Sequence, residues 1–290
     1  FKKNKFSWNM NTGYTHHEGN TNSLNEFSYM SNGTQIKARE SYWNNQWYQN
    51  YYVRNNWQYK VSDLANLTLK YNFNHTYSKP QTHGDMFNAF GDAETAYKQQ
   101  TLGKSNNNMH ELQFVYSQKL DTIGTNFTLT SNTEFQNNTN SNQLFVEDQM
   151  ASTILADNNF VYSQTKADFE TPFKAVNGNL SLGAHYTHSV STNNGSYIWD
   201  QARNYIPYDF KYTNKAAYAS VSSNISSLMI SAGLRLENLT YQSETAVDSL
   251  NLKQDYTTIF PTVTLKYPIM SGVYLSAGYS KRMNLPGAQS

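Results

Sequence analysis

Apolar and polar residues alternate with a period of two in several stretches of the chain. The clearest stretch runs from residue 67 to residue 77, where Leu67, Leu69, Tyr71 and Phe73 occupy odd positions and polar residues occupy even ones. This is the period of a β-strand with one apolar face. A second alternating run, from Tyr51 to Val61, precedes it and is separated by four residues, Ser62 to Ala65. The two runs predict a hairpin with a tight connection.

The same pattern predicts four further hairpins with short connections. They join residues 112–116 to 127–135 across 120–124, 161–169 to 180–186 across 172–179, 217–221 to 228–236 across 224–227, and 259–267 to 273–279 across 268–271. Near the start, residues 6–10 and 27–29 alternate as well, but Asn32-Gly33 is compatible with either a turn or a bulge, so the register before Tyr42 stays open. The pattern predicts an all-β fold of about 12 strands.

Longer connections rich in Asn, Ser, Gly and Gln separate these hairpins. They cover about residues 78–108, 137–158, 191–205 and 238–251. Alternation of short and long connections is typical of an antiparallel transmembrane β-barrel with short periplasmic turns and long extracellular loops. Within the first long connection, the alanines between Met86 and Gln100 suit a short loop helix. The chain is interpreted as one barrel domain over residues 1–290.

Composition is compatible with this interpretation. The 22 Lys and Arg residues nearly balance the 21 Asp and Glu residues, which argues against a nucleic-acid partner. Mean hydropathy is −0.72, and no stretch approaches the roughly 18 apolar residues of a membrane-spanning helix. A barrel tolerates low hydropathy because only one face of each strand meets lipid. Tyr and Trp residues near the predicted strand ends suit an interfacial girdle.

Motifs in the C-terminal half resemble a known family. Residues 231–237 (SAGLRLE), 260–265 (FPTVTL) and 275–286 (LSAGYSKRMNLP) occur in the order found in outer-membrane barrels of the TonB-dependent receptor superfamily, and residues 168–173 and 210–218 are also similar to that family. The resemblance covers about Asp168 to Pro286. Leu285 stands where the family usually has Arg, and Asn214 where it often has Glu. Arg235 and Glu237 share one strand face, which should be the lumen, because a charge facing lipid costs about 2–4 kcal/mol.

The resemblance implies a nutrient receptor-transporter of the bacterial cell outer membrane, with a barrel of about 22 strands around a plug that contacts the inner-membrane TonB complex. No plug sequence and no signal peptide are present, so we expect this chain to be an internal part of such a barrel. Because its first and last strands would have other partners, we expect an open, curved sheet or a closure with few ladder hydrogen bonds at the seam. Its partners would be outer-membrane lipid, the plug, TonB and a small nutrient. No enzymatic activity is expected. The alternatives are a passive porin-like or adhesin barrel without energy coupling, and a soluble β-sandwich.

Candidate chemistry is sparse. His16 and His17, and His185 and His188, are spaced so that each pair points to opposite strand faces, and His83 with Asp85 falls in a loop; neither a metal site nor a cofactor is predicted. No Gly-x-Ser-x-Gly, His-Glu-x-x-His or phosphate-binding glycine motif occurs. A barrel hydrolase with Ser and His, or Asp and His, on neighbouring strands is the enzymatic alternative. The residues predicted to bind the ligand lie in one outer loop, where exposed rings beside polar groups can grip a sugar, siderophore or peptide: Tyr197, Trp199, Asp200, Arg203, Tyr205 and Tyr208. Packing of this loop on its neighbours is the alternative reading.

Overall fold

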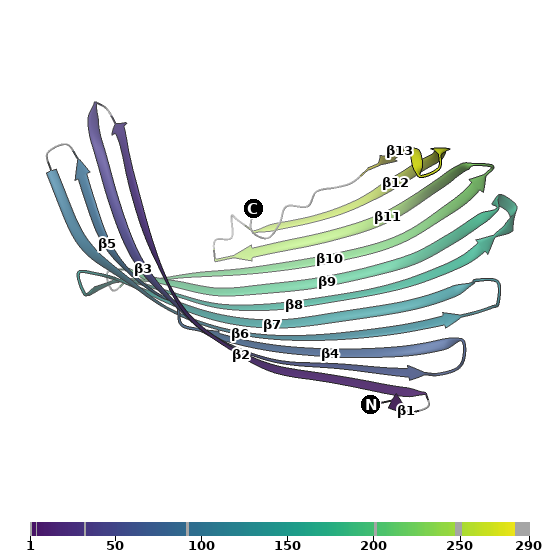
Figure 1. The fold of residues 1–290 in the computed structure, drawn as a ribbon, viewed down its shortest axis with the longest axis horizontal. Helices are drawn as coiled ribbons and strands as arrows, with labels where there is room; N and C mark the ends of the chain where they lie inside the picture. The colour runs from purple at the N-terminus through teal and green to yellow at the C-terminus, as the bar shows by residue number, and fades with distance from the viewer. Residues whose placement is uncertain are drawn as a thin grey trace.

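The computed structural model describes residues 2–3, 5–31, 33–90, 93–199, 202–246 and 251–281. They form one antiparallel sheet of 13 strands (Figure 1). The strands are β1 (Lys2–Lys3), β2 (Phe6–Ser31), β3 (Thr34–Lys60), β4 (Ala65–Ser78), β5 (Gln81–Phe90), β6 (Ala93–Lys119), β7 (Asn126–Val146), β8 (Gln149–Phe173), β9 (Gly178–Trp199), β10 (Ala202–Ile225), β11 (Leu228–Thr245), β12 (Leu252–Met270) and β13 (Val273–Ser280). The predicted all-β antiparallel class is confirmed.

Strands adjacent in the sequence are neighbours in the sheet, except around β5. A 3-10 turn at Lys174–Val176 connects β8 to β9. Among the described residues, no helix is long and apolar enough to cross a membrane. A chain in which successive strands pair in order builds its sheet from hairpins alone.

Strands β4 and β5 are two parts of one strand that Pro80 interrupts. Both lie between β3 and β6, and the register continues across the gap: Ser78 pairs with Tyr48 and Gln81 with Asn45. Proline has no N–H to donate to a ladder, which accounts for the break. The carbonyl oxygen of Pro80 still accepts a hydrogen bond from the Gly103 N–H at 2.8 Å. In Figure 1, β2, β3, β5 and the beginning of β6 rise away from the rest of the sheet beyond this point.

The expected long loops are largely strand, which corrects the interpretation of those segments. Strands β7 and β8 meet at a turn at Glu147 and Asp148, within the predicted loop 137–158. Strand β3, with 27 residues, is about 90 Å long, whereas about 9–11 residues cross a membrane. Beyond the membrane both faces of a strand meet water, so apolar alternation disappears while the backbone pairing continues.

The loop helix expected between Met86 and Gln100 is wrong. Its described residues belong to β5 and β6, which pair with each other, for example Met86 with Tyr97. Strands β3 and β7 pair with their outer edges. Backbone hydrogen bonds to strands already in place therefore override the helix propensity of three alanines.

The predicted tight turns are confirmed at one end of the sheet. Residues 61–64 connect β3 to β4, residues 120–125 connect β6 to β7, and residues 271–272 connect β12 to β13.

Two turn glycines have a positive φ angle, Gly272 with 80° and Gly33 with 81°. Glycine adopts this conformation without steric cost. Gly33 lies between β2 and β3, so the open choice near residue 33 resolves to a turn; Asn32 lies outside the described residues.

The register defines two faces of the sheet. Residues directly opposite in antiparallel strands point to the same side, so one row can be followed across ten strands. It contains only apolar and aromatic residues: Phe6, Tyr59, Leu67, Tyr116, Leu129, Ala167, Ala184, Ala217, Leu236 and Ile259. We call the face with this row the outer face. The opposite face, with Lys70, Arg235 and Glu237, is the inner face.

The apolar band on the outer face runs obliquely to the strands. On β4 the band covers residues 67–73 and is centred at Lys70. The register row through Lys70 reaches β11 at Leu239, but the band on β11 covers residues 230–236 and is centred at Gly233, six residues away. This shift is about 20 Å along the strand over inter-strand spacings that total about 29 Å. The strands therefore tilt by about 35° from the normal to the band, as in membrane barrels.

The sheet is open. Its order of neighbours begins at β1 and ends at β13, and no ladder joins these edges within the described residues. In Figure 1 the two edge strands lie on opposite sides of the view. The expectation of an open, curved sheet is confirmed for the described residues.

Candidate functional site

A charged and aromatic network occupies the inner face of β8 to β11. Tyr218 on β10 donates a hydrogen bond to the Asp168 carboxylate on β8. The tyrosine passes over β9 at Gly183, which lies directly opposite both residues. Lys166 forms an ion pair with Asp168, with Nζ 3.0 Å from Oδ2, and lies 5.7 Å from the Tyr218 ring centroid. Because Gly183 has no side chain, groups two strands apart can meet.

Arg235 on β11 extends this network. It forms an ion pair with Glu237, and its guanidinium carbon lies 5.4 Å from the Tyr218 ring centroid. Its Nη2 also donates to Nδ1 of His185, at 3.0 Å. Glu237 accepts a second hydrogen bond from Asn214 Nδ2, at 3.2 Å. The predicted placement of Arg235 and Glu237 on one face is confirmed.

The network can fix the wall and present polar atoms, but its charges compensate one another. Lys166 pairs with Asp168 and Arg235 pairs with Glu237. Arg235 donates to His185 Nδ1, and the other ring nitrogen, Nε2, lies 2.9 Å from both the Thr187 hydroxyl and the Gln164 side-chain amide nitrogen. Paired charges next to an aromatic ring stiffen a barrel wall more than they attract a charged ligand.

An inner-face hollow of about 450 Å³ lies beside the network. Tyr218, Arg235, Glu237, Phe260 and Thr262 contribute to its lining. Sequence reasoning identified Arg235 and Glu237 but missed Lys166, Asp168 and Tyr218. The alternation could have revealed them. Lys166, Asp168 and Tyr218 occupy even positions, and the neighbouring odd positions hold the apolar residues Ala167, Phe169, Ala217 and Ala219, which places the three polar side chains on the opposite face.

The structure divides the predicted ligand-binding residues between the two faces. Tyr197 and Trp199 on β9 share the inner face, with ring centroids 6.2 Å apart and nearly parallel planes. Tyr208 lies opposite Asn193 of β9, so it shares that face. Asp200 lies outside the described residues. Three of the predicted residues therefore gather on the inner wall.

The other two predicted residues lie on the outer face. Arg203 Nη2 donates to Ser196 Oγ at 3.3 Å, and Tyr205 donates to Asn194 Oδ1 at 2.9 Å. Ser196 lies directly opposite Tyr205, one position along from the inner-face residue Tyr197. The period of two in a strand, which a loop would not impose, separates these residues from the inner set.

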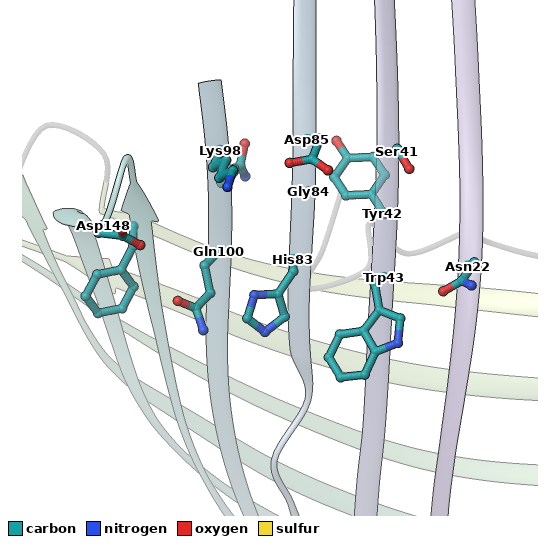
Figure 2. A pocket seen from close by; sticks show the side chains of 12 residues that line it. Asn22, Ser41, Tyr42, Trp43, His83, Gly84, Asp85, Lys98, Gln100 and Asp148 are labelled. Atoms are coloured by element: carbon teal, nitrogen blue, oxygen red, sulfur yellow. The ribbon is translucent and has the colours of Figure 1, made fainter. Parts of the chain in front are cut away.

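A second hollow, of about 500 Å³, lies on the extension formed by β2, β3, β5 and β6 (Figure 2). One register row crosses it: Asn22, Trp43, His83, Gln100 and Phe145. The ring centroids of Trp43 and His83 are 5.3 Å apart. Asp85 and Lys98, directly opposite each other, line the same hollow. Sequence reasoning noted His83 and Asp85 but had no means of bringing the other residues to them.

Tyr42 also lines this hollow. Burial, followed by the neighbouring Glu40 carboxylate, raises the pKa of its hydroxyl. Tyr42 donates a hydrogen bond to Glu40 Oε2 at 3.2 Å. Within the described residues, no three His, Asp or Glu side chains are grouped so that they could hold a metal ion. The hollow offers aromatic surface, amides and a carboxylate, which suit a polar organic group.

Comparison with known proteins supports the outer-membrane assignment. A family model described as the outer membrane protein beta-barrel family matches residues 118–290, more than half of the chain. No curated protein matches. The fold is similar to three solved structures: the ferric citrate transporter FecA, with 12% identity and a TM-score of 0.52; the siderophore receptor PiuA from Acinetobacter baumannii, with 11% and 0.54; and the ferric-catecholate import receptor Fiu from E. coli K12, with 8% and 0.59.

These similarities cover 93%, 96% and 96% of this chain but only 43%, 49% and 50% of the three structures, in the same order. The chain thus spans about half of their length. At such low identity the likeness shows a shared fold. The oblique apolar band and the family match together place the chain in the bacterial outer membrane. It belongs to the outer membrane protein beta-barrel family.

Proposed function

We propose that this chain is part of the barrel of a TonB-dependent receptor that binds a nutrient outside the cell and imports it with energy from the inner membrane. The observation that carries the proposal is the open sheet, which overlaps about half of three receptor and transporter structures over more than nine-tenths of its own length. The motifs in residues 231–286 support the same superfamily. Further strands of the whole protein would close the barrel, and a plug would fill it.

In this proposal the two faces of the sheet have different partners. The outer face meets lipid along the apolar band. The inner face meets the plug and the ligand, with Tyr197, Trp199 and Tyr208 as ligand contacts on the wall. Arg203 and Tyr205 belong to the outer end of the same strand pair, and Asp200 stays a predicted ligand contact outside the described residues. No residue is assigned a catalytic role.

The test separates an energy-coupled receptor from a passive barrel. The whole protein would be reconstituted in liposomes, and swelling would be recorded in isotonic solutions of arabinose and of maltotriose. A receptor closed by a plug should give no more swelling than empty liposomes. Swelling as fast as that of a general porin, used as the positive control, would overturn the proposal in favour of a passive barrel.

A second arm tests binding of the TonB protein in vitro. Because a plugged receptor opens only when TonB pulls on it, purified TonB periplasmic domain should bind the whole protein in a pull-down from detergent. Truncation of the first residues of the whole protein's plug should abolish this binding while leaving barrel assembly unchanged. Absence of any TonB binding by the correctly assembled protein would contradict the proposal.

A further inference from the structure

The inner face carries a continuous row of neutral hydrogen-bonding side chains above the apolar band. The register aligns nine residues from β2 to β11: Thr15, Asn50, Thr76, Asn107, Asn138, Asn158, Asn193, Tyr208 and Thr245. Four neighbouring strands, β6 to β9, contribute asparagine at the same level. A primary amide offers two donors and one acceptor oxygen, all without charge.

Charged side chains are absent from a wide zone around this row. The inner-face rows that pass through residues 191, 193, 195, 197 and 199 of β9 contain no Asp, Glu, Lys or Arg among the described residues of β2 to β11. The outer face at the same level does carry charges, namely Glu18, Lys79, Lys104, Asp157, Arg203, Asp209 and Glu244. At this level, the charged side chains of the described residues are therefore on the outer face only.

Part of the amide row lacks intramolecular partners. The Oδ1 atoms of Asn138 and Asn193, which flank Asn158, are buried and accept no hydrogen bond within the described residues. Elsewhere the row is paired: Thr76 donates to Asn50 Oδ1 at 3.2 Å, and Asn107 Oδ1 accepts from Gln136 at 3.1 Å. A buried acceptor without a donor is costly. This part of the row therefore keeps hydrogen-bonding capacity that the described side chains do not use.

Aromatic rings frame the row on the same face. The nearly parallel pair Tyr197 and Trp199 lies above it on β9, and 53% of the Trp199 surface is exposed. Below it on β8, the rings of Phe160 and Tyr162 are 6.4 Å apart with planes 12° from parallel. Exposed ring faces bind apolar C–H surfaces, whereas amides exchange hydrogen bonds with hydroxyl groups.

We propose that the ligand bound by this inner wall is a neutral oligosaccharide. This inference rests on the proposed receptor function and names its substrate class. Hydroxyl groups both donate and accept, as the amides do, and the faces of pyranose rings fit the aromatic pairs. An anionic iron chelate would need Arg or Lys to compensate its charge when it leaves water, and this zone supplies neither.

Binding is measured on the purified whole protein by isothermal titration calorimetry. The probes are heptasaccharides of α-1,4-glucan, β-1,3-glucan and mannan, with ferric citrate and ferric enterobactin as anionic probes. We expect at least one neutral oligosaccharide to bind, with an affinity that is unchanged between low and high NaCl because no charge is involved. Binding of an anionic chelate alone, or of none of the probes, would overturn the inference.

Variants of adjacent residues locate the site. Asn158→Leu and Asn193→Leu should each weaken oligosaccharide binding by about tenfold or more, the loss that corresponds to one buried hydrogen bond to the ligand. Asn159→Leu is the matched control, because Asn159 is the next residue of β8 and lies on the outer face, paired with Asn137. An equal loss in all three variants, or no loss in the first two, would contradict the assignment. Asn158→Asp retains the size of the side chain and tests whether its neutrality matters, with weaker binding expected.

The same measurements separate this inference from the proposed function. TonB binding combined with selective binding of an anionic chelate would refute the oligosaccharide while leaving the receptor in place. Oligosaccharide binding by a protein that does not bind TonB and conducts maltotriose would refute the receptor while leaving the ligand class in place.

Discussion

Tyr218 on β10 hydrogen-bonds to Asp168 on β8 by crossing over Gly183 on the strand between them. A Cβ atom at position 183 would lie 2.2 Å from Cζ of the Tyr218 ring, too close for both to stay in place. The same arrangement recurs on the inner face, where Tyr52 covers Gly13 and Tyr42 covers Gly84. Each glycine leaves room for a tyrosine from the adjacent strand, which restores packed surface where a side chain is missing.

Gly183→Ala should therefore destabilise the barrel. The methyl group would displace the Tyr218 ring and break its bond to Asp168, at a cost of about 1–3 kcal/mol. The measurement is the temperature at which the folded band converts to the unfolded band in a detergent gel. Ser181→Ala, on the same strand and face, is the control. Identical conversion temperatures for the two variants would disprove the packing role of Gly183.

Leu69→Arg should destabilise the protein, and Lys70→Gln should have little effect. Leu69 lies opposite Trp57 and Phe114 on the outer face, where an arginine near the bilayer centre costs about 2–4 kcal/mol. Urea unfolding in lipid vesicles gives the free energy difference. Single cysteines at 69 and 70 provide a second readout, because the chain has no native Cys. Stronger labelling by a lipid-soluble probe at 70 than at 69 would reverse the two faces.

The turn at Asp121 should lose part of its stability in acid. The hydroxyl of Thr125, with the backbone N–H groups of Thr125, Gly124 and Ile123, holds the pKa of the Asp121 carboxyl below its ordinary value of 3.8. With the folded pKa below the unfolded one, the stabilisation is complete above the unfolded value and is lost as pH falls through the folded value.

Asp121→Ala should accordingly lower the conversion temperature at pH 7, and the difference from the wild type should shrink near pH 2. Asp63→Ala, in another turn at the same end of the sheet, is the comparison, because Asp63 forms an ion pair with Lys60 but, within the described residues, no hydrogen bond to the backbone of its own turn. A wild-type advantage at Asp121 that grows on acidification would have the wrong sign and would exclude this mechanism.

Gly103→Val should disrupt the extension beyond the membrane. A Cβ at 103 would meet Pro80 Cγ at 2.7 Å and Asn142 Oδ1 at 2.9 Å, and the larger valine would force β6 away from the interrupted strand. Hydrogen exchange measured by mass spectrometry should show faster exchange in β5 than in the wild type, with β4 less affected. Leu102→Val, at the preceding position, is the control. Equal protection of β5 in both variants would show that the contact has no structural role.

The two edges of the sheet should not join each other. A Trp8→Cys and Leu275→Cys pair, on β2 and β13, should give no intramolecular cross-link with a short bifunctional thiol reagent. A Trp57→Cys and Leu69→Cys pair should cross-link, because these positions are direct partners. Efficient cross-linking of the first pair would indicate a small closed barrel and would favour the porin-like alternative.

The sequence alone determined those features that depend on the membrane. Where one face of a strand meets lipid, residues such as Leu67 and Leu69 must alternate with polar ones, so the membrane part of each strand, its facing and the tight turns are visible as a period of two. Arg235 and Glu237 were placed on the inner face for the same reason. The open sheet followed from the expectation that its edge strands have other partners.

The tertiary structure decided what happens beyond the membrane. There both faces of each strand are exposed to water, so runs of Asn and Ser resemble loops in the sequence. Backbone hydrogen bonds between neighbouring strands nevertheless continue the sheet through these runs. Pairing also set which residues meet: it separated Arg203 and Tyr205 from Tyr197 and Trp199, and it aligned asparagines that are at least 20 residues apart in the chain. Side-chain pattern records the solvent on each face, whereas the register between strands is fixed by hydrogen bonds between distant backbone segments, which no local pattern records.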